Sequence, residues 1–255
     1  MAREGSGEGL AHSLVDLMTS LLVIFILLLV VFLYQASIRE IAERKGTKGT
    51  EDNRKIVQAR LDPVLRKLGE GIELFPDACD PLTLVIIVPR QLLDFEKNDD
   101  KIRDDGKHFL DLFAPAVASV LCEQSLFDTV DSLVAEGHTD STGNEGINIP
   151  LSARRATNVV LYSREVLTHS SNGLEPCLLE LASATGRGPR DLIHRNEVIQ
   201  NRRVEEGCRR GTADVAAKFS TEPEDRDRSR RVEFKIRVRS EEQRRVEKER
   251  LSLGQ

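Results

Sequence analysis

The sequence predicts an α+β domain preceded by a single membrane-spanning helix. Residues 14–34 are almost entirely apolar, and after residue 70 short apolar runs alternate with stretches of helical periodicity. At ~1.5 Å of rise per residue, a helix over 14–34 is about 30 Å long, which matches the hydrocarbon core of a bilayer. Near the end of the chain, residues 232–238 alternate apolar and charged side chains, as a strand with one buried face does.

The soluble part is expected to fold as βαβαββ, with its helices packed on one sheet. A short apolar run between two prolines predicts the first strand, and a helical pattern with proline in its first turn predicts the second helix. The segment 187–228 is long and charged, and no element is expected there. The expected elements are 82–88, 106–122, 132–137, 150–167, 181–186 and 232–238.

Composition divides the chain into five parts. An amphipathic pattern at 56–68 predicts a helix, and the polar, glycine-containing residues 44–53 predict a linker before it. The parts are a short cytoplasmic tail at 1–13, the membrane helix at 14–34, a juxtamembrane helix and linker at 35–70, the soluble domain at 71–240 and a charged tail at 241–255.

The apolar segment is expected to stay in the membrane. A cleavable signal peptide would begin with basic residues and end at small ones, whereas Arg3 is outnumbered by Glu4 and Glu8 and residues 35–38 form a poor cleavage site. The signals for orientation conflict. Basic residues after the helix favour a cytoplasmic C-terminus, but long domains translocate despite such charges. We place the soluble domain outside the cytoplasm because its cysteines suit an oxidising compartment.

One acid interrupts the apolar segment. Asp16 is the only formally charged residue between Glu8 and Arg39. A carboxylate inside a bilayer costs ~2.5–3.5 kcal/mol on insertion scales, so it usually faces protein or water and has a function. Thr19 and Ser20 lie on the same helix face and could help to coordinate or relay a cation. The alternative is that Asp16 lies near the membrane edge and caps the helix.

The composition excludes several functional classes. A net charge of −5 and an aromatic content of 4 % provide neither a basic field nor a stacking platform for nucleic acid. No P-loop, Gly-x-Ser-x-Gly or His-Glu-x-x-His motif occurs, and no cysteine spacing predicts a zinc site. We therefore expect no enzymatic activity, no cofactor and no bound metal.

The four cysteines all follow the membrane segment. An even number in an extracytoplasmic domain permits two disulfides in three possible pairings. The alternative is four buried thiols that behave as small apolar side chains. The candidates are Cys79, Cys122, Cys177 and Cys208.

A set of short motifs gives the most specific information. The chain has Gly-His-Thr-Asp at 137–140, Asn-x-x-Leu-Ser-x-x-Arg-Ala at 148–156, Gly-x-Gly at 186–188 and Arg-Arg-Val-Glu-Phe at 230–234. Over roughly residues 80–238 this pattern resembles the OmpA-like peptidoglycan-binding domains. The sequence departs from the family at Ser229, where Asn is usual, and in the lengthened interval before it, which holds a near-duplicate of the last motif at 201–205.

In that family the ligand is the zwitterionic end of diaminopimelate in the peptide stem. The resemblance implies that Asp140 accepts hydrogen bonds from the ligand ammonium and that Arg155 grips the ligand carboxylate with its planar fork. Asn148, Thr139 and Arg231 are the expected supporting residues. The alternative is that Asp140 caps the following helix and forms a structural salt bridge with Arg155.

The membrane segment has a second resemblance. Val-Asp-Leu-Met-Thr-Ser at 15–20 is similar to the ion-carrying segment of MotB-type stator subunits. Together with an OmpA-like domain, it implies a homodimer in a bacterial inner membrane, surrounded by five MotA-like subunits and attached to peptidoglycan in the periplasm. Asp16 would then carry H⁺ or Na⁺, of which we favour H⁺.

Within this class, the chain is more similar to the ZorB component of the Zorya anti-phage defence system than to a flagellar stator. The short acidic N-terminal tail, the cysteines and the long segment 187–228 differ from a plain flagellar subunit. The implied motor partner is then ZorA. A flagellar MotB-type stator and a passive peptidoglycan-binding membrane anchor are the alternatives.

Overall fold

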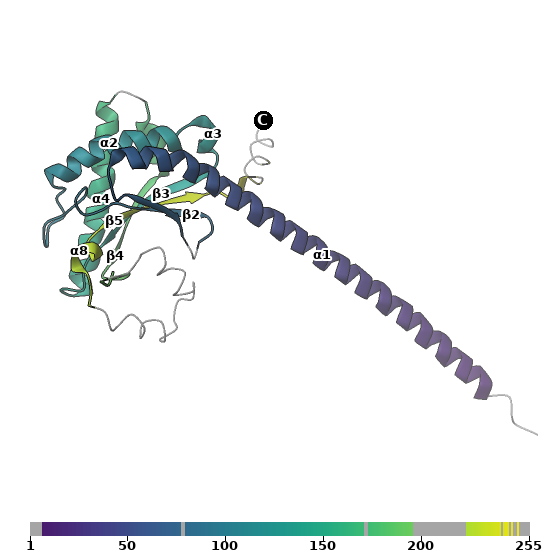
Figure 1. Cartoon of the computed structure of the whole chain (residues 1–255). Helices are drawn as coiled ribbons and strands as arrows, with labels where there is room; N and C mark the ends of the chain where they lie inside the picture. The colour runs from purple at the N-terminus through teal and green to yellow at the C-terminus, as the bar shows by residue number, and fades with distance from the viewer. Residues whose placement is uncertain are drawn as a thin grey trace, which may run out of the picture. The chain divides into compact units, whose positions relative to one another are not determined.

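The computed structural model describes residues 7–77, 80–170, 173–195 and 223–240, together with 242–244, 246 and 249. The chain divides into two compact units, Met1–Lys48 and Gly49–Gln255, and Figure 1 shows the helices and strands of each. Helix α1 (Gly7–Leu68) contributes to both units. Most of the segment 187–228 and of the charged tail at 241–255 lies outside the described residues.

The N-terminal unit consists of the first part of α1. Its apolar side chains from Leu21 to Leu33 are all between 46 and 68 % exposed. Among the described residues, no helix has a stretch of apolar sequence sufficient for a bilayer crossing. The side chains of Asp16 and Ser20 lie outside the described part, and Thr19 is exposed. The membrane helix at 14–34 therefore stays a prediction.

The second part of α1 belongs to the soluble domain. Val57, Leu61 and Leu65 are at most 2 % exposed and form one stripe of the core. Pro63 lies inside the helix and does not interrupt it, and the helix ends at Leu68. The expected linker at 44–53 is helical as well, which differs from the prediction. A glycine costs a helix only about 1 kcal/mol relative to alanine, and packing of the adjoining stripe can offset that.

A five-stranded sheet forms the centre of the soluble domain, in the order β1-β2-β5-β3-β4. β3 and β4 are parallel, and every other neighbouring pair is antiparallel. The strands are β1 (Glu73–Pro76), β2 (Thr83–Ile87), β3 (Val130–His138), β4 (Ala182–Gly188) and β5 (Val232–Val238). The predicted βαβαββ order and the α+β class are confirmed, with β1 as one additional edge strand.

Two helices after α1 match predicted ones and differ from them at their ends, whereas the short helices at 124–127, 175–181 and 226–229 were not predicted. The helix expected at 150–167 begins earlier, because the Asn144 side chain accepts a hydrogen bond from the amide of Ile147 at 3.0 Å and caps its first turn. Pro150 therefore lies inside it. The helices after α1 are α2 (Asp104–Leu121), α3 (Gln124–Phe127), α4 (Glu145–His169), α5 (Glu175–Leu181) and α8 (Arg226–Ser229).

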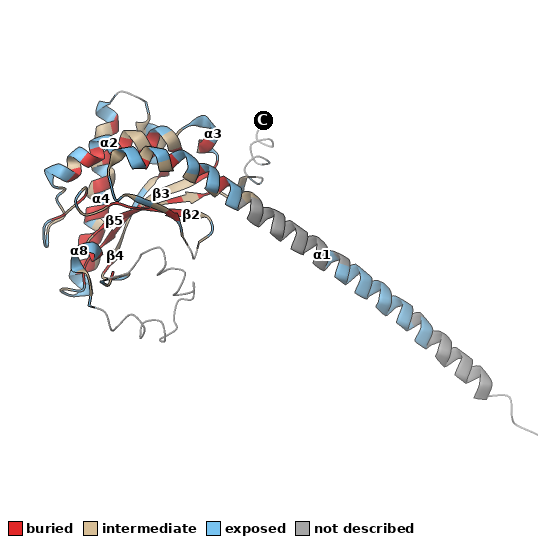
Figure 2. Ribbon diagram, in the orientation of Figure 1, coloured by how far each residue is buried: buried red, intermediate tan, exposed pale blue. Residues whose placement is uncertain are grey.

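The two faces of the sheet are covered unequally. Residues of α1, α2 and α4 pack with one face in the main core, which contains Leu84 and Ile86 of β2. On the opposite face, Val85 and Ile87 pack with Phe75 and Ile193 in a smaller cluster. Both faces of β2 are therefore buried, which explains its uninterrupted apolar sequence (Figure 2).

Candidate functional site

The candidate site is built on the loop that leaves β3 and enters α4. Gly143 has a φ of +92°, a conformation that favours glycine, and it lets the chain turn before the cap residue Asn144. Asn148 shapes the same loop from inside α4. Its Nδ2 donates to the carbonyl oxygens of Thr142 at 2.9 Å and Asp140 at 3.4 Å. Asn148 therefore supports the loop that carries Asp140.

Asp140 is buried and ion-paired. Its Oδ2 accepts a hydrogen bond from Nη1 of Arg230 at 2.6 Å, and its Oδ1 accepts from the amide of Thr142 at 2.9 Å and from the Thr142 hydroxyl. Burial alone would raise the pKa of Asp140, but the hydrogen bonds from Thr142 and Arg230 outweigh it and lower that pKa. The carboxylate is thus negatively charged at neutral pH.

Arg155 is held in one orientation by backbone carbonyls. Its Nε donates to the oxygen of Asp99 and its Nη2 to the oxygen of Glu96, both at 2.9 Å, and its guanidinium carbon lies 5.1 Å from the centre of the Phe95 ring. The residue is 1 % exposed. Within the part of the chain that the structure describes, Nη1 donates no hydrogen bond. The guanidinium is therefore fixed in place, and its Nη1 edge can still donate hydrogen bonds to a ligand.

Asp140 and Arg155, both described, form no ion pair with each other. The cation on Asp140 is Arg230, which also pairs with Asp227. Burial lowers the pKa of Arg155, and the positive charge of Arg230 lowers it further, whereas Asp94, Asp140 and Asp100 raise it. Asp140 therefore acts on both guanidinium groups, and a carboxylate beside two such groups suits a ligand with both an ammonium and a carboxylate.

Arg231 and Thr139 make their hydrogen bonds to residues other than Asp140. The Nε of Arg231 donates to Oε1 of Glu233 at 2.7 Å, in a buried ion pair away from the loop. Thr139 is buried, and its amide donates to the oxygen of Gly188 at 2.9 Å. Arg231 was the arginine expected to support the site, but its neighbour Arg230 is the one on Asp140.

Ser229, where the family usually has Asn, connects two distant segments. Its hydroxyl accepts a hydrogen bond from the amide of Ile193 at 2.9 Å and lies 3.3 Å from the oxygen of the same residue. Hydrogen bonds of this serine therefore connect the chain just before β5 to Ile193, which follows β4. The near-duplicate motif at 201–205 lies outside the described residues.

One of the candidate disulfides is present. Cys122, at the C-terminal end of α2, is bonded to Cys177 in α5, with the two Cα atoms 6.0 Å apart. This bond excludes two of the three pairings. Cys79 and Cys208 lie outside the described residues.

Comparisons with known proteins give partial similarities. No family model matches the chain. The outer-membrane lipoprotein YfiB of Pseudomonas aeruginosa is 35 % identical over 78 residues, which are 31 % of this chain and 42 % of YfiB. The chain thus matches about two fifths of the length of this curated relative.

The similar solved structures include periplasmic domains of MotB and an OmpA-like domain. The periplasmic domain of Helicobacter pylori MotB is 19 % identical, with a TM-score of 0.43, over 72 % of this chain and 90 % of that structure. The OmpA-like domain of FopA1 from Francisella tularensis is 16 % identical, with a TM-score of 0.34, over 66 % of this chain and 82 % of that structure.

Proposed function

We propose that the soluble domain binds peptidoglycan by holding the zwitterionic end of a diaminopimelate residue between Asp140 and Arg155. The observation that carries this proposal is the fixed guanidinium of Arg155, which has an uncommitted edge near a buried carboxylate. A ligand carboxylate can accept from that edge without reorienting the side chain. Since Arg155 is already ordered, little rotamer entropy is lost on binding.

The ligand ammonium would bind Asp140. That carboxylate is at present neutralised by Arg230, so the ammonium must replace or share this ion pair. Arg230 has a second carboxylate partner in Asp227, which can keep its charge compensated while Asp140 turns to the ligand. The exchange therefore leaves no buried charge without a partner, which is the condition for binding at low cost.

The wall-binding proposal predicts that Asp140→Asn abolishes sedimentation of the purified full chain with insoluble, diaminopimelate-containing peptidoglycan. The substitution keeps the shape of the side chain but removes the charge that faces the ammonium. Loss of one member of a buried charge pair costs about 2–5 kcal/mol, so affinity should fall by at least about 30-fold. Free diaminopimelate should compete with sedimentation of the unmodified chain.

Arg155→Ala should lose sedimentation as well, and Arg154→Ala is its matched control. Arg154 is the preceding residue, but it is 57 % exposed and pairs with Asp100 on the surface. Circular dichroism spectra would show whether each variant is folded. Sedimentation retained by a folded Asp140→Ala/Arg155→Ala double variant would contradict the assignment of the site.

We further propose that the N-terminal part makes the chain a membrane stator subunit of a MotA/MotB-like motor, and more specifically the ZorB component of a Zorya defence system. The similarity at 15–20 and the exposed apolar side chains from Leu21 to Leu33 support this role. Asp16 would carry the ion, H⁺ or Na⁺, with Thr19 and Ser20 beside it. A dimer of the chain would stand inside a ring of five MotA- or ZorA-like subunits.

The motor proposal predicts that Asp16→Asn abolishes the cellular phenotype while leaving membrane insertion and wall binding unchanged. The amide has nearly the shape of the carboxylate but cannot take up and release a cation. Phage resistance and swimming, measured in the host, separate a defence role from a flagellar one. Full activity of the Asp16→Asn variant would leave only a passive anchor.

A further inference from the structure

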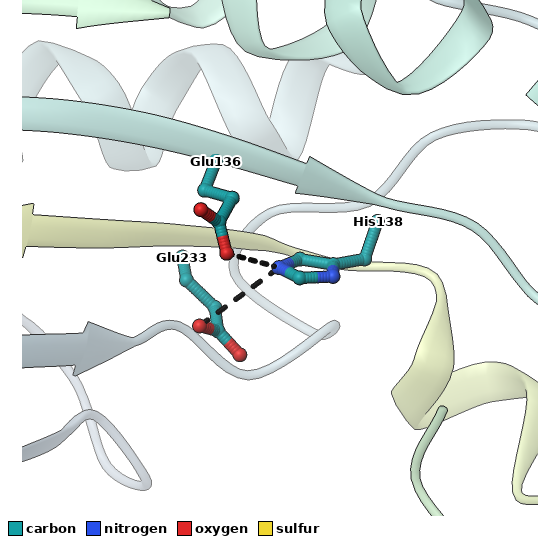
Figure 3. A group of neighbouring side chains, drawn as sticks. All are labelled: Glu136, His138 and Glu233. Carbon is teal, nitrogen blue, oxygen red and sulfur yellow. Dashed lines mark ion pairs between the residues drawn. The ribbon is translucent and has the colours of Figure 1, made fainter. Parts of the chain in front are cut away.

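Three ionisable side chains converge between β3 and β5, outside the contacts of Asp140 and Arg155. Glu136 on β3 is paired directly with Glu233 on β5 in the strand register, and His138 lies two residues further along β3 (Figure 3). All three are at most 7 % exposed. Two carboxylates placed opposite each other in a sheet repel, and although Lys235 pairs with Glu136 and Arg231 with Glu233, a cation between the two carboxylates would reduce that repulsion further.

The orientation of His138 indicates where that charge belongs. Its Nδ1 lies 3.3 Å from the carbonyl oxygen of Arg190, and since a carbonyl only accepts, Nδ1 carries the hydrogen. Nε2 then points toward the two carboxylates, 3.2 Å from Oε1 of Glu136 and 3.9 Å from Oε2 of Glu233 (Figure 3). The Nε2 atom is buried and makes no hydrogen bond of acceptable geometry.

We propose that Glu136, His138 and Glu233 bind a divalent transition-metal cation of the Zn²⁺ type. One imidazole nitrogen and two carboxylate oxygens are ligands that such ions accept, and the three donor atoms lie within 4.8 Å of one another. An ion about 2 Å from Nε2 would lie within reach of both carboxylates. It would lie between Nε2, which makes no hydrogen bond of acceptable geometry, and the two carboxylates that Nε2 faces.

Neighbouring contacts resemble the outer sphere of a metal site. The Arg190 carbonyl fixes the tautomer of His138, as an outer partner of a ligating histidine commonly does. Arg231 bonds Oε1 of Glu233, whereas Oε2 is the oxygen that faces His138. Arg231, which was expected at the peptidoglycan site, thus orients a ligand of the proposed metal site.

Lys235 is the competitor of the metal ion. Its ammonium bonds Oε1 of Glu136, the same oxygen that faces His138, and Arg187 lies 3.9 Å from that oxygen. The Lys235 side chain is 21 % exposed, so its ammonium can turn into solvent when an ion arrives. A second rival is a proton on Nε2, which would make His138 a cation between the two glutamates. Metal affinity should therefore rise when Lys235 is removed.

The site does not depend on wall binding, although the two are adjacent. His138 is the last residue of β3 and immediately precedes Thr139 and Asp140. An ion joining β3 to β5 at this point would fix the base of the loop that carries Asp140. This cluster could not be predicted from the sequence, because Glu233 comes 95 residues after His138 and meets it only through the pairing of β5 with β3.

The test is a Zn²⁺ titration of the full chain, purified in detergent and stripped of metal with a chelator. Isothermal titration calorimetry should give one ion per chain, and Co²⁺ should give visible ligand-field absorption when it replaces Zn²⁺. Glu233→Gln and His138→Gln should each weaken binding by more than about 100-fold, beyond the effect of an outer-sphere change. His108→Gln, at an exposed histidine of α2, is the matched control and should bind like the unmodified chain.

Lys235→Met keeps the proposal testable if the ligand variants fail to fold. Removal of the competing ammonium should tighten Zn²⁺ binding by about tenfold or more, because the ion no longer has to displace it. Absence of stoichiometric Zn²⁺ binding in both the unmodified chain and Lys235→Met overturns the proposal in favour of a protonated His138. Equal binding by the His138→Gln variant overturns it as well, and neither result bears on peptidoglycan sedimentation.

Discussion

Loss of the disulfide between Cys122 and Cys177 is expected to destabilise the soluble domain by about 4 kcal/mol. The bond closes a loop of 55 residues, and in the chain-entropy account a loop of this length corresponds to about 4 kcal/mol at 25 °C. The loop contains all of β3 and α4, from which the proposed peptidoglycan site is built. Reduction therefore increases the freedom of the unfolded chain in the segment that contains the proposed peptidoglycan site.

Helix α5, which contains Cys177, should be the first element to unfold when the disulfide is lost. It has only seven residues, and within it Leu178 and Leu181 are its buried side chains. A helix this short has no stability of its own in water, so the disulfide and these leucines hold it on the core. The double variant Cys122→Ala/Cys177→Ala should show the full loss in urea denaturation without reductant.

The control for this prediction is the complementary pair, Cys79→Ala/Cys208→Ala. That variant keeps the Cys122–Cys177 bond, so addition of a reductant should still lower its free energy of unfolding by about 4 kcal/mol. If the complementary variant is insensitive to reductant, the stabilising bond is a different one.

The sheet could be predicted from the sequence where burial leaves a periodic pattern. β5 alternates apolar and charged residues, and β2 is a continuous apolar run because both of its faces are covered. β1 was not predicted because a segment of four residues that ends in proline is too short to show an alternating pattern. The helical state of residues 44–53 was missed for another reason, since two glycines suggested a linker while packing further along α1 favours helix.

The motifs predict the candidate site residues, which stay a prediction, but they do not indicate the contacts that these residues make. Arg155 is held by carbonyls of residues 96 and 99, and nothing in a linear sequence indicates contacts to backbone oxygens so far away. The side on which Arg231 lies had a signal in the sequence. Val232 faces the core, so strand alternation places Arg231 on the same side as Glu233 rather than beside Asp140. The pairing of Arg230 with Asp140 follows only from the way the chain turns before β5.

Gly137→Ala is expected to destabilise the domain by about 3 kcal/mol and to disrupt the proposed binding site at the same time. A Cβ at residue 137 would lie 2.1 Å from the backbone oxygen of Ser152 in α4. Gly186 is the partner of Gly137 on β4, and a Cβ there would lie 2.4 Å from the amide nitrogen of Ala153. The two glycines together form a flat patch on which α4 rests, and backbone atoms cannot move aside as a side chain can.

The effect on binding follows from where the contact lies in the chain. Asp140 comes three residues after Gly137, and Arg155 comes three residues after Ser152. A methyl group that pushes α4 away from β3 therefore separates the two residues proposed to hold the ligand. Peptidoglycan sedimentation should fall for Gly137→Ala even at temperatures where circular dichroism shows a folded chain.

Gly146→Ala is the matched control. Gly146 lies in the exposed first turn of α4, and the nearest atom to its added Cβ would be the side-chain oxygen of Asn144 at 3.2 Å, which can shift. Alanine there should change stability by less than about 1 kcal/mol, since a better helix former offsets the contact. Normal sedimentation by a folded Gly137→Ala variant would mean that the close contact between β3 and α4 does not set the distance from Asp140 to Arg155.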